Sequence, residues 1–150
     1  MLYIGYDSSN LGQQLAFDIC LKSIKQHNNN IKTITLNRQK LRDKNIFFRQ
    51  NNDGATQFTY TRFLIPYLQN YQGWALFCDS DFLWLCDPQE IFDTYNDPQY
   101  AVYCVKHQIE FFQDSYKMNK QKQSWYPKKN WSSLMLFNCC HPSVKNLNLE

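Results

Sequence analysis

Strong charge of one sign is missing from this sequence. It carries 16 basic and 13 acidic residues, a net charge of +3 over 150 positions. Such a mild balance is too weak a reason to propose nucleic-acid binding from electrostatics alone, so no nucleic-acid partner is expected. Basic residues do gather at positions 38–42 and 117–129, and we interpret both clusters as solvated faces.

Long apolar runs are missing as well. No stretch approaches the ~20 apolar residues that span a bilayer, so no transmembrane segment is expected. Met1 leads directly into a strand-like segment. A signal peptide would need a basic start followed by an apolar stretch of about 7–15 residues. From these absences we expect a cytoplasmic protein.

The sequence also has no C-x-x-C pair. Most of its cysteines lie in apolar runs such as residues 75–78, so we interpret them as reduced, buried, small hydrophobes. Cys139, Cys140 and His141 are adjacent, but without a second group of ligands they are a weak signal for zinc. The six cysteines are Cys20, Cys78, Cys86, Cys104, Cys139 and Cys140.

What the sequence does contain is enough apolar material for a core. Hydrophobic residues make up 43% of it and aromatic residues 17%, which a disordered chain does not carry. A domain of this size removes ~70% of its unfolded surface from water. Because no linker, internal repeat or long low-complexity segment divides the chain, we expect a single domain over residues 1–150.

The first part of the chain follows a strand–helix–strand pattern. Residues 2–6 are apolar β-formers, and positions 7–10 have turn and helix-cap chemistry. Helical spacing of apolar residues follows until residues 28–30, and the β-branched segment 31–36 is a second strand. A unit of this kind favours a parallel sheet. We therefore predict an α/β fold with a Rossmann-like, mostly parallel sheet flanked by helices.

Further elements are predicted along the rest of the chain. Thr56 is expected to cap a helix that continues to Leu68, in which Pro66 introduces a kink or starts a new turn. A strand follows Gly73 and a short helix follows Pro88. Later strand candidates are residues 100–105 and 133–137.

Two carboxylates, Asp79 and Asp81, interrupt an otherwise apolar run. Burying an unpaired carboxylate costs several kcal/mol, so these side chains must be protonated, paired or metal-bound if they are buried. Two positions apart, they point to the same side of an extended segment, and a parallel sheet presents ligands at the carboxyl ends of its strands. Converging carboxylate oxygens suit Mg²⁺ or Mn²⁺. The alternative is that both residues cap a strand end and face water.

Three segments, in order, resemble parts of glycosyltransferases with the A-type, Rossmann-like fold, and of family 8 in particular. Residues 76–83, Leu-Phe-Cys-Asp-Ser-Asp-Phe-Leu, resemble the D-x-D motif. Residues 56–66 resemble the helix before that motif, which carries an Arg, here Arg62, shortly before an apolar–Pro step. Residues 129–138 resemble the strand that is entered through an Asn and small residues. Together these segments cover the middle and the end of the chain.

The resemblance implies metal-dependent transfer of a hexose from a nucleotide-sugar donor. UDP is the expected nucleotide, the acceptor is an unknown glycan, protein or lipid, and the anomeric configuration is retained. Asp79 and Asp81, with Ser80 between them, would bind Mn²⁺ or Mg²⁺ on the diphosphate. The cation would stabilise the charge that develops on the departing nucleoside diphosphate.

The resemblance also gives roles to residues outside the D-x-D motif. Gly5, Tyr6 and Asp7, at the end of the first strand, would contact the nucleoside, with Gly5 permitting close approach of the backbone. The alternative for these three is an ordinary strand end. Arg62 would reach the sugar or the diphosphate with its planar fork of donors, and its alternative is a surface salt bridge.

Candidate ligands of the transferred sugar lie in the last segment. Asn130 and Ser133 would hydrogen-bond the sugar. Trp131 could stack on a sugar face, although a place in the core is the favoured interpretation.

One departure from the resemblance concerns a third metal ligand, a histidine expected nearer the C-terminus. His27, His107 and His141 do not match its motif, and the chain stops at Glu150 while residues 142–149 begin another helix. We therefore expect a domain that is either incomplete at its C-terminus or degenerate. The alternatives are an inactive or truncated sugar-nucleotide-binding protein, a phosphohydrolase of the haloacid dehalogenase type, and a nucleotidyltransferase.

Overall fold

The computed structural model describes residues 1–8, 11–50, 56–106, 115–116, 122–123 and 130–148. Its strands are β1 (Leu2–Tyr6), β2 (Thr33–Asn37), β3 (Trp74–Cys78), β4 (Val102–Lys106), β5 (Ser115–Tyr116), β6 (Lys122–Gln123) and β7 (Asn130–Asn138). Its helices are α1 (Leu11–His27), α2 (Arg38–Asp43), α3 (Ile65–Leu68) and α4 (Gln89–Thr94), with 3₁₀ helices η1 (Thr61–Leu64) and η3 (Pro142–Asn146). None of these helices has the length and apolarity that a membrane crossing requires.

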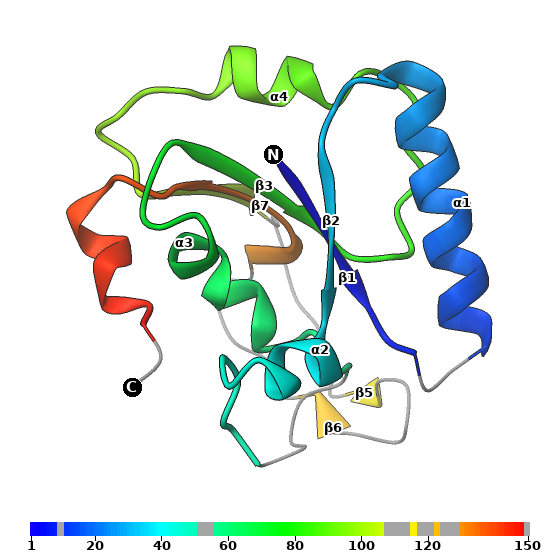
Figure 1. Ribbon diagram of the computed structural model, residues 1–150. Coiled ribbons are helices and arrows are strands. Elements are labelled where there is room, and N and C mark those ends of the chain that lie inside the picture. The colour runs from blue at the N-terminus through cyan, green and yellow to red at the C-terminus, as the bar shows by residue number, and fades with distance from the viewer. Residues whose placement is uncertain (9–10, 51–55, 107–114, 117–121, 124–129, 149–150) are drawn as a thin grey trace.

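The main sheet has five strands in the order β2-β1-β3-β7-β4 (Figure 1). β1 is parallel to β2 and β3, whereas β7 is antiparallel to both β3 and β4. β4 therefore points the same way as β1, β2 and β3, and β7 alone in this sheet is reversed. The predicted α/β, Rossmann-like sheet is confirmed. The amino end of β7 meets the carboxyl ends of its neighbours at one edge of the sheet.

The first face of the sheet is covered by α1 and α4 (Figure 1). Alternate residues of the central strands point to this face, because side chains in a strand alternate between its two sides. Cys20 and Ile24 of α1 pack there and are fully buried. The strand residues on this face include Leu2, Ile4, Leu76, Cys78 and Leu136.

The second face is covered by α2, η1 and α3. Tyr3, Phe77 and Phe137 alternate with the residues of the first face and are at most 1% exposed. Helical and turn residues that close this side are Leu41, Phe58, Leu64 and Ile65. Strands β1, β3 and β7 thus contribute side chains to both layers, and the sheet lies between two apolar clusters.

The helix predicted from Thr56 to Leu68 is in part wrong. Residues 56–60 form turns, in which Thr59 N–H donates to Thr56 O at 3.2 Å and Thr56 N–H donates to Thr59 Oγ1 at 3.1 Å. Helical structure begins with η1, and Pro66 lies in the first turn of α3. Proline is tolerated there because its missing N–H would have no partner in the helix. The prediction that Pro66 starts a new turn is confirmed.

The interpretation of the cysteines as buried hydrophobes is correct for three of them. Cys20, Cys78 and Cys139 are buried, whereas Cys86, Cys104 and Cys140 are exposed, and all six are free thiols. Cys104 is exposed on the edge strand β4. The sulfurs of Cys20 and Cys78 are 4.0 Å apart, between α1 and β3.

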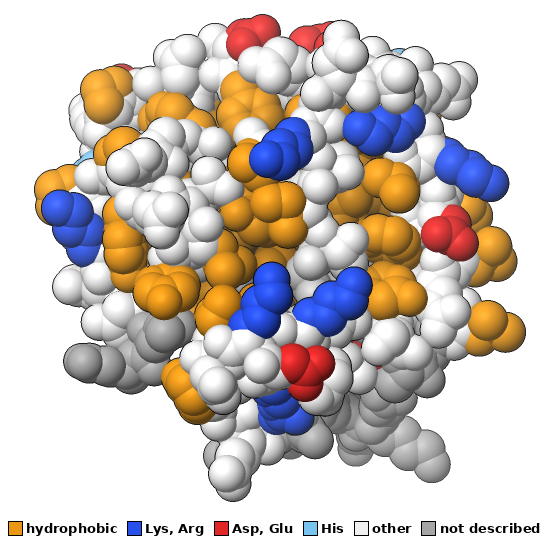
Figure 2. All heavy atoms as spheres, in the orientation of Figure 1, with side chains coloured by type: hydrophobic (Ala, Val, Ile, Leu, Met, Phe, Trp, Pro, Cys, Tyr) orange, Lys and Arg blue, Asp and Glu red, His pale blue; other side chains and the backbone are white. Residues whose placement is uncertain are grey.

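Figure 2 shows Lys and Arg side chains scattered over the face drawn, among hydrophobic and polar side chains. The cluster at residues 38–42 is only partly solvated. Lys40 is exposed, whereas the guanidinium of Arg42 lies 5.7 Å from the Phe47 ring centroid and donates to Arg49 O at 2.9 Å. The cluster at 117–129 falls almost wholly outside the described residues.

Candidate functional site

A hollow of about 480 Å³ lies at the carboxyl end of β3. Strand β3 ends at Cys78, and the chain then turns through Asp79, Ser80 and Asp81. Asp79 N–H donates to Ser133 O at 2.9 Å, which fixes this turn against β7. The residues that line the hollow are Asp79, Asp81, Phe82, Leu83, Trp131 and Ser133.

The second wall of the hollow exists because β7 is longer than β3. β7 has nine residues and β3 has five, and β3 pairs with residues 134–138 of β7. The first four residues of β7 therefore extend past the end of β3, beside the turn that carries the carboxylates. Trp131 and Ser133 lie on this extension.

Asp79 and Asp81 border the same hollow, as their spacing predicts. Ser80, between them, is buried, and its hydroxyl donates to Gln13 Oε1 of α1 at 2.8 Å. Asp81 is exposed, while the side chain of Asp79 is 21% exposed. The turn therefore directs Ser80 toward α1 and leaves both carboxylates beside the hollow.

Arg62 is the cationic partner of Asp79. Its Nη2 lies 3.2 Å from Asp79 Oδ1, its Nη1 donates to Ser132 O, and its Nε donates to Phe58 O at 3.4 Å. The guanidinium carbon is 4.7 Å from the Phe77 ring centroid. Arg62 is 5% exposed and is not a lining residue of the hollow.

Burial dominates the electrostatics of this pair. It raises the pKa of Asp79 to about 6, against the opposing effect of Arg62, and the charge of Asp81 raises it further. Burial also lowers the pKa of Arg62, and Asp79 opposes that change. Asp79 Oδ1 is buried and accepts no hydrogen bond, so its stabilising partner among the described residues is the Arg62 charge.

The carboxylates fit two of the ligand positions of a hard divalent cation. Oxygen ligands suit Mg²⁺ and Mn²⁺, and Asp79 keeps one oxygen, Oδ2, without a hydrogen-bond or ion-pair partner among the described residues. Across the described residues, no group of three or more His, Cys, Asp and Glu side chains gathers as a complete protein cage would. Such cations commonly keep several waters and bind substrate phosphates, so two carboxylates can suffice.

The predicted alternatives for metal binding do not gather at this hollow. His27 ends α1, His141 Nδ1 accepts from Ser143 N–H at 3.2 Å, and His107 lies outside the described residues. Cys139 is buried, while Cys140 Sγ accepts from Gly73 N–H at 3.1 Å. Cys139, Cys140 and His141 therefore do not converge on one point.

The end of β1 gives a mixed outcome for the predicted nucleoside contacts. Gly5 is buried, and a Cβ added to it would lie 2.6 Å from Cδ2 of Phe58. The Phe58 ring occupies the space on the Cβ side of Gly5, and contact between Gly5 and a nucleoside stays a prediction. The Tyr6 ring packs edge-on against Phe17 at 4.8 Å, and Asp7 Oδ2 accepts from Gln57 N–H at 3.4 Å.

Tyr6 and Asp7 nevertheless follow the strand that neighbours β3. Ile4 pairs with Cys78 across these two strands, so Tyr6 and Asp7 lie at the same edge of the sheet as the hollow. Neither residue lines the hollow itself. Whether they contact a nucleoside stays a prediction.

The start of β7 holds the residues predicted to bind the sugar. Ser133 lines the hollow, whereas Asn130 is exposed, pairs with Lys106 across β4 and is not a lining residue. The interpretation of Trp131 as a core residue is wrong, since it is 47% exposed and lines the hollow. Phe82 and Leu83, which directly follow Asp81, are further lining residues that the sequence pattern does not predict.

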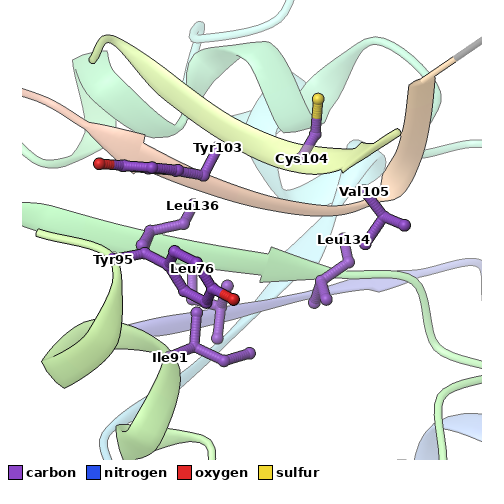
Figure 3. A pocket seen from close by; sticks show the side chains of 8 residues that line it. All are labelled: Leu76, Ile91, Tyr95, Tyr103, Cys104, Val105, Leu134 and Leu136. Carbon is purple, nitrogen blue, oxygen red and sulfur yellow. The ribbon is translucent and has the colours of Figure 1, made fainter. Parts of the chain in front are cut away.

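A second hollow, of about 220 Å³, lies between α4 and the strands β4 and β7. Figure 3 shows side chains from α4 and the sheet converging on it, while the Cys104 thiol points away from Ile91 and Leu134. Its lining residues are Leu76, Ile91, Tyr95, Tyr103, Cys104, Val105, Leu134 and Leu136. This lining contains no carboxylate or basic side chain.

The chain resembles one curated protein over nearly its whole length. It is 39% identical over 151 residues to Protein CDI of Arabidopsis thaliana, and the match covers 99% of this chain and 56% of that protein. No family model matches the chain. The chain therefore spans a little more than half the length of this relative.

A solved structure with the same arrangement is the galactosyltransferase LgtC in complex with donor and acceptor sugar analogues. The two superpose with a TM-score of 0.53 and 12% sequence identity, covering 93% of this chain and 58% of LgtC. An identity this low shows the fold and no more, so membership of family 8 stays a prediction. The order of the strands, the reversed β7 and this superposition together show that the chain has the glycosyltransferase A-type fold.

Proposed function

We propose that this chain is the donor-binding part of a metal-dependent glycosyltransferase. The observation that carries the proposal is the placement of Asp79 and Asp81. Both border one hollow at the edge of a glycosyltransferase A-type sheet, with a half-exposed tryptophan on the facing wall. Ligands of open α/β sheets bind at the carboxyl ends of the strands, which is where this hollow lies.

In this proposal Asp79 and Asp81 bind Mn²⁺ or Mg²⁺ together with the diphosphate of a nucleotide sugar. The bound cation would act as a Lewis acid that stabilises charge on the departing diphosphate. Trp131, which is 47% exposed and lines the hollow, would contact the sugar, and Ser133 would offer a hydroxyl for a hydrogen bond. Phe82 and Leu83 add apolar side chains to the wall of the hollow.

Several parts of the proposal come from the resemblance alone. These are UDP as the nucleotide, retention of configuration, a glycan, protein or lipid acceptor, and the roles of Tyr6, Asp7 and Asn130. The galactosyltransferase superposition supports a sugar as the transferred group. Because the chain covers 58% of that structure, the acceptor and the activity of a whole protein belong to the proposal as well.

The proposal is tested by isothermal titration of UDP with Mn²⁺ and with EDTA. We expect Mn²⁺ to tighten UDP binding, and Asp81→Asn to reduce the affinity in Mn²⁺ by about tenfold or more, which is about 1.4 kcal/mol. Asp18→Asn, at an exposed position on α1, is the matched control and should bind like the wild type. Equal affinity of Asp81→Asn and the wild type in Mn²⁺ would refute the site.

A second candidate is a protein that binds sugar nucleotides without turning them over. It is favoured by the absence of a third acidic, histidine or cysteine ligand beside Asp79 and Asp81 among the described residues. Release of UDP from UDP-glucose and UDP-galactose with Mn²⁺ separates the two candidates, since a transferase hydrolyses its donor slowly even without an acceptor. Rapid release of phosphate from p-nitrophenyl phosphate would instead favour a phosphohydrolase.

A further inference from the structure

We infer that Arg62 is a positioning residue, which orients Asp79 for the metal and does not contact the nucleotide-sugar donor. This inference rests on the proposed function, because it concerns the same cation. It replaces the role that the resemblance implies for Arg62, in which the guanidinium reaches the sugar or the diphosphate.

Three nitrogens of the Arg62 guanidinium group already have partners. They join Asp79 after β3, Ser132 on β7 and Phe58 in the turn before η1. The planar fork of arginine suits such a task, since its donors point in fixed directions. Arg62 therefore connects three segments that are far apart in the sequence and meet at one corner of the hollow.

The Arg62 side chain is also buried. The side chain of Arg62 is 6% exposed, and the guanidinium carbon lies 4.7 Å from the Phe77 ring centroid and 5.7 Å from that of Phe58. Arg62 is not a lining residue of the hollow. A donor in the hollow would therefore meet Asp79 and Asp81 before it could reach the buried guanidinium of Arg62.

The two carboxylate oxygens of Asp79 have different surroundings. Oδ1 is buried and faces Arg62 Nη2, whereas Oδ2 has no hydrogen-bond or ion-pair partner among the described residues. Oδ2 is also not one of the buried unpartnered atoms, so solvent reaches it. Arg62 thus holds one oxygen and leaves the other accessible beside the hollow, where Asp81 is the second carboxylate.

Removing the guanidinium should therefore act on the metal first. Without it, Oδ1 would be buried without a charge partner, and the carboxylate would be free to rotate. Partners that orient a metal ligand typically contribute about 10- to 100-fold to metal affinity. Binding of the nucleotide itself would change only as far as it depends on the cation.

The test compares Arg62→Lys and Arg62→Met with the wild type and with Arg42→Met, a control for loss of an arginine that packs on an aromatic ring elsewhere. Mn²⁺ affinity is measured by electron paramagnetic resonance, and UDP affinity by titration calorimetry over a series of Mn²⁺ concentrations. We expect both Arg62 variants to bind Mn²⁺ about 10- to 100-fold more weakly. At saturating Mn²⁺, their UDP affinity should return to that of the wild type.

Two results would overturn the inference while leaving the proposed function in place. One is Mn²⁺ affinity in both variants equal to that of the wild type, which would make Arg62 a purely structural residue. The other is UDP affinity that stays low at saturating Mn²⁺, which would mean that Arg62 touches the donor. If the wild type binds UDP no better with Mn²⁺ than without, the proposed function fails, and this inference fails with it. Should Arg62→Met not fold, as shown by circular dichroism, Arg62→Lys alone decides.

Discussion

At the scale of single residues, the contact between Gly5 and Phe58 shows how a missing side chain shapes the protein. The Phe58 ring lies where a Cβ of Gly5 would be, and it is 2% exposed. Phe58 also supplies the carbonyl that accepts from Arg62 Nε. Gly5 therefore supports the geometry of the site through its packing against Phe58.

Gly5→Ala should destabilise the protein by about 1–3 kcal/mol, because the added methyl would lie 2.6–2.7 Å from two carbons of a buried ring. The free energy of unfolding in urea measures this. Adding Phe58→Leu should recover part of the loss, since the smaller side chain relieves the overlap. An unchanged urea midpoint for Gly5→Ala would contradict the close packing.

Asp79 predicts a dependence of stability on pH. Burial raises its pKa from 3.8 to about 6 in the folded protein, so the folded state binds this proton more tightly than the unfolded state does. The resulting stabilisation is fully present below about pH 4 and is lost as the pH rises through about 6. The shift corresponds to up to about 3 kcal/mol.

Chemical denaturation at pH 4 and pH 7 checks this prediction. The stability of the wild type relative to Asp79→Asn should fall between the two pH values, because the asparagine side chain does not titrate. Asp93→Asn, at an exposed position on α4, is a control that should follow the wild type at both. A stability difference between wild type and Asp79→Asn that does not change with pH would refute the raised pKa.

At the scale of elements, the sequence identifies the strands well but leaves their ends and directions open. The apolar run before Asp79 predicts β3, and the pattern near residue 135 predicts β7. Neither pattern shows that β7 is reversed, because apolar spacing is the same for a strand in either direction. The exposure of Trp131 is not visible in the sequence either, because it depends on how far β7 extends past β3.

The turn at residues 56–60 is another element that the spacing of apolar residues does not reveal. Phe58 fits a helical pattern with later residues, yet its ring is buried against Gly5 from a turn. A tertiary contact thus outweighs local helical preference, which is worth less than 1 kcal/mol per residue for ordinary side chains. The spacing of the two carboxylates is more informative, since Asp79 and Asp81 do border one hollow.

At the scale of the whole molecule, two segments far apart in the sequence form the candidate site. The turn after β3 supplies the carboxylates, and the start of β7, about fifty residues later, supplies Trp131 and Ser133. A reversed strand makes this possible, because its first residues lie beside the last residues of its neighbour. The fold class followed from the strand–helix–strand pattern, whereas this convergence could be recognised only through the resemblance.

The six thiols differ in burial, so they should react with a thiol reagent at different rates. Cys86, Cys104 and Cys140 should react at once with Ellman's reagent in the native protein, while Cys20, Cys78 and Cys139 should react only when the fold opens. Three fast equivalents followed by a slow phase, which urea accelerates, are the expected result. Because Cys78 is next to Asp79, the slow phase would report how often the strand beneath the carboxylates is exposed to reagents.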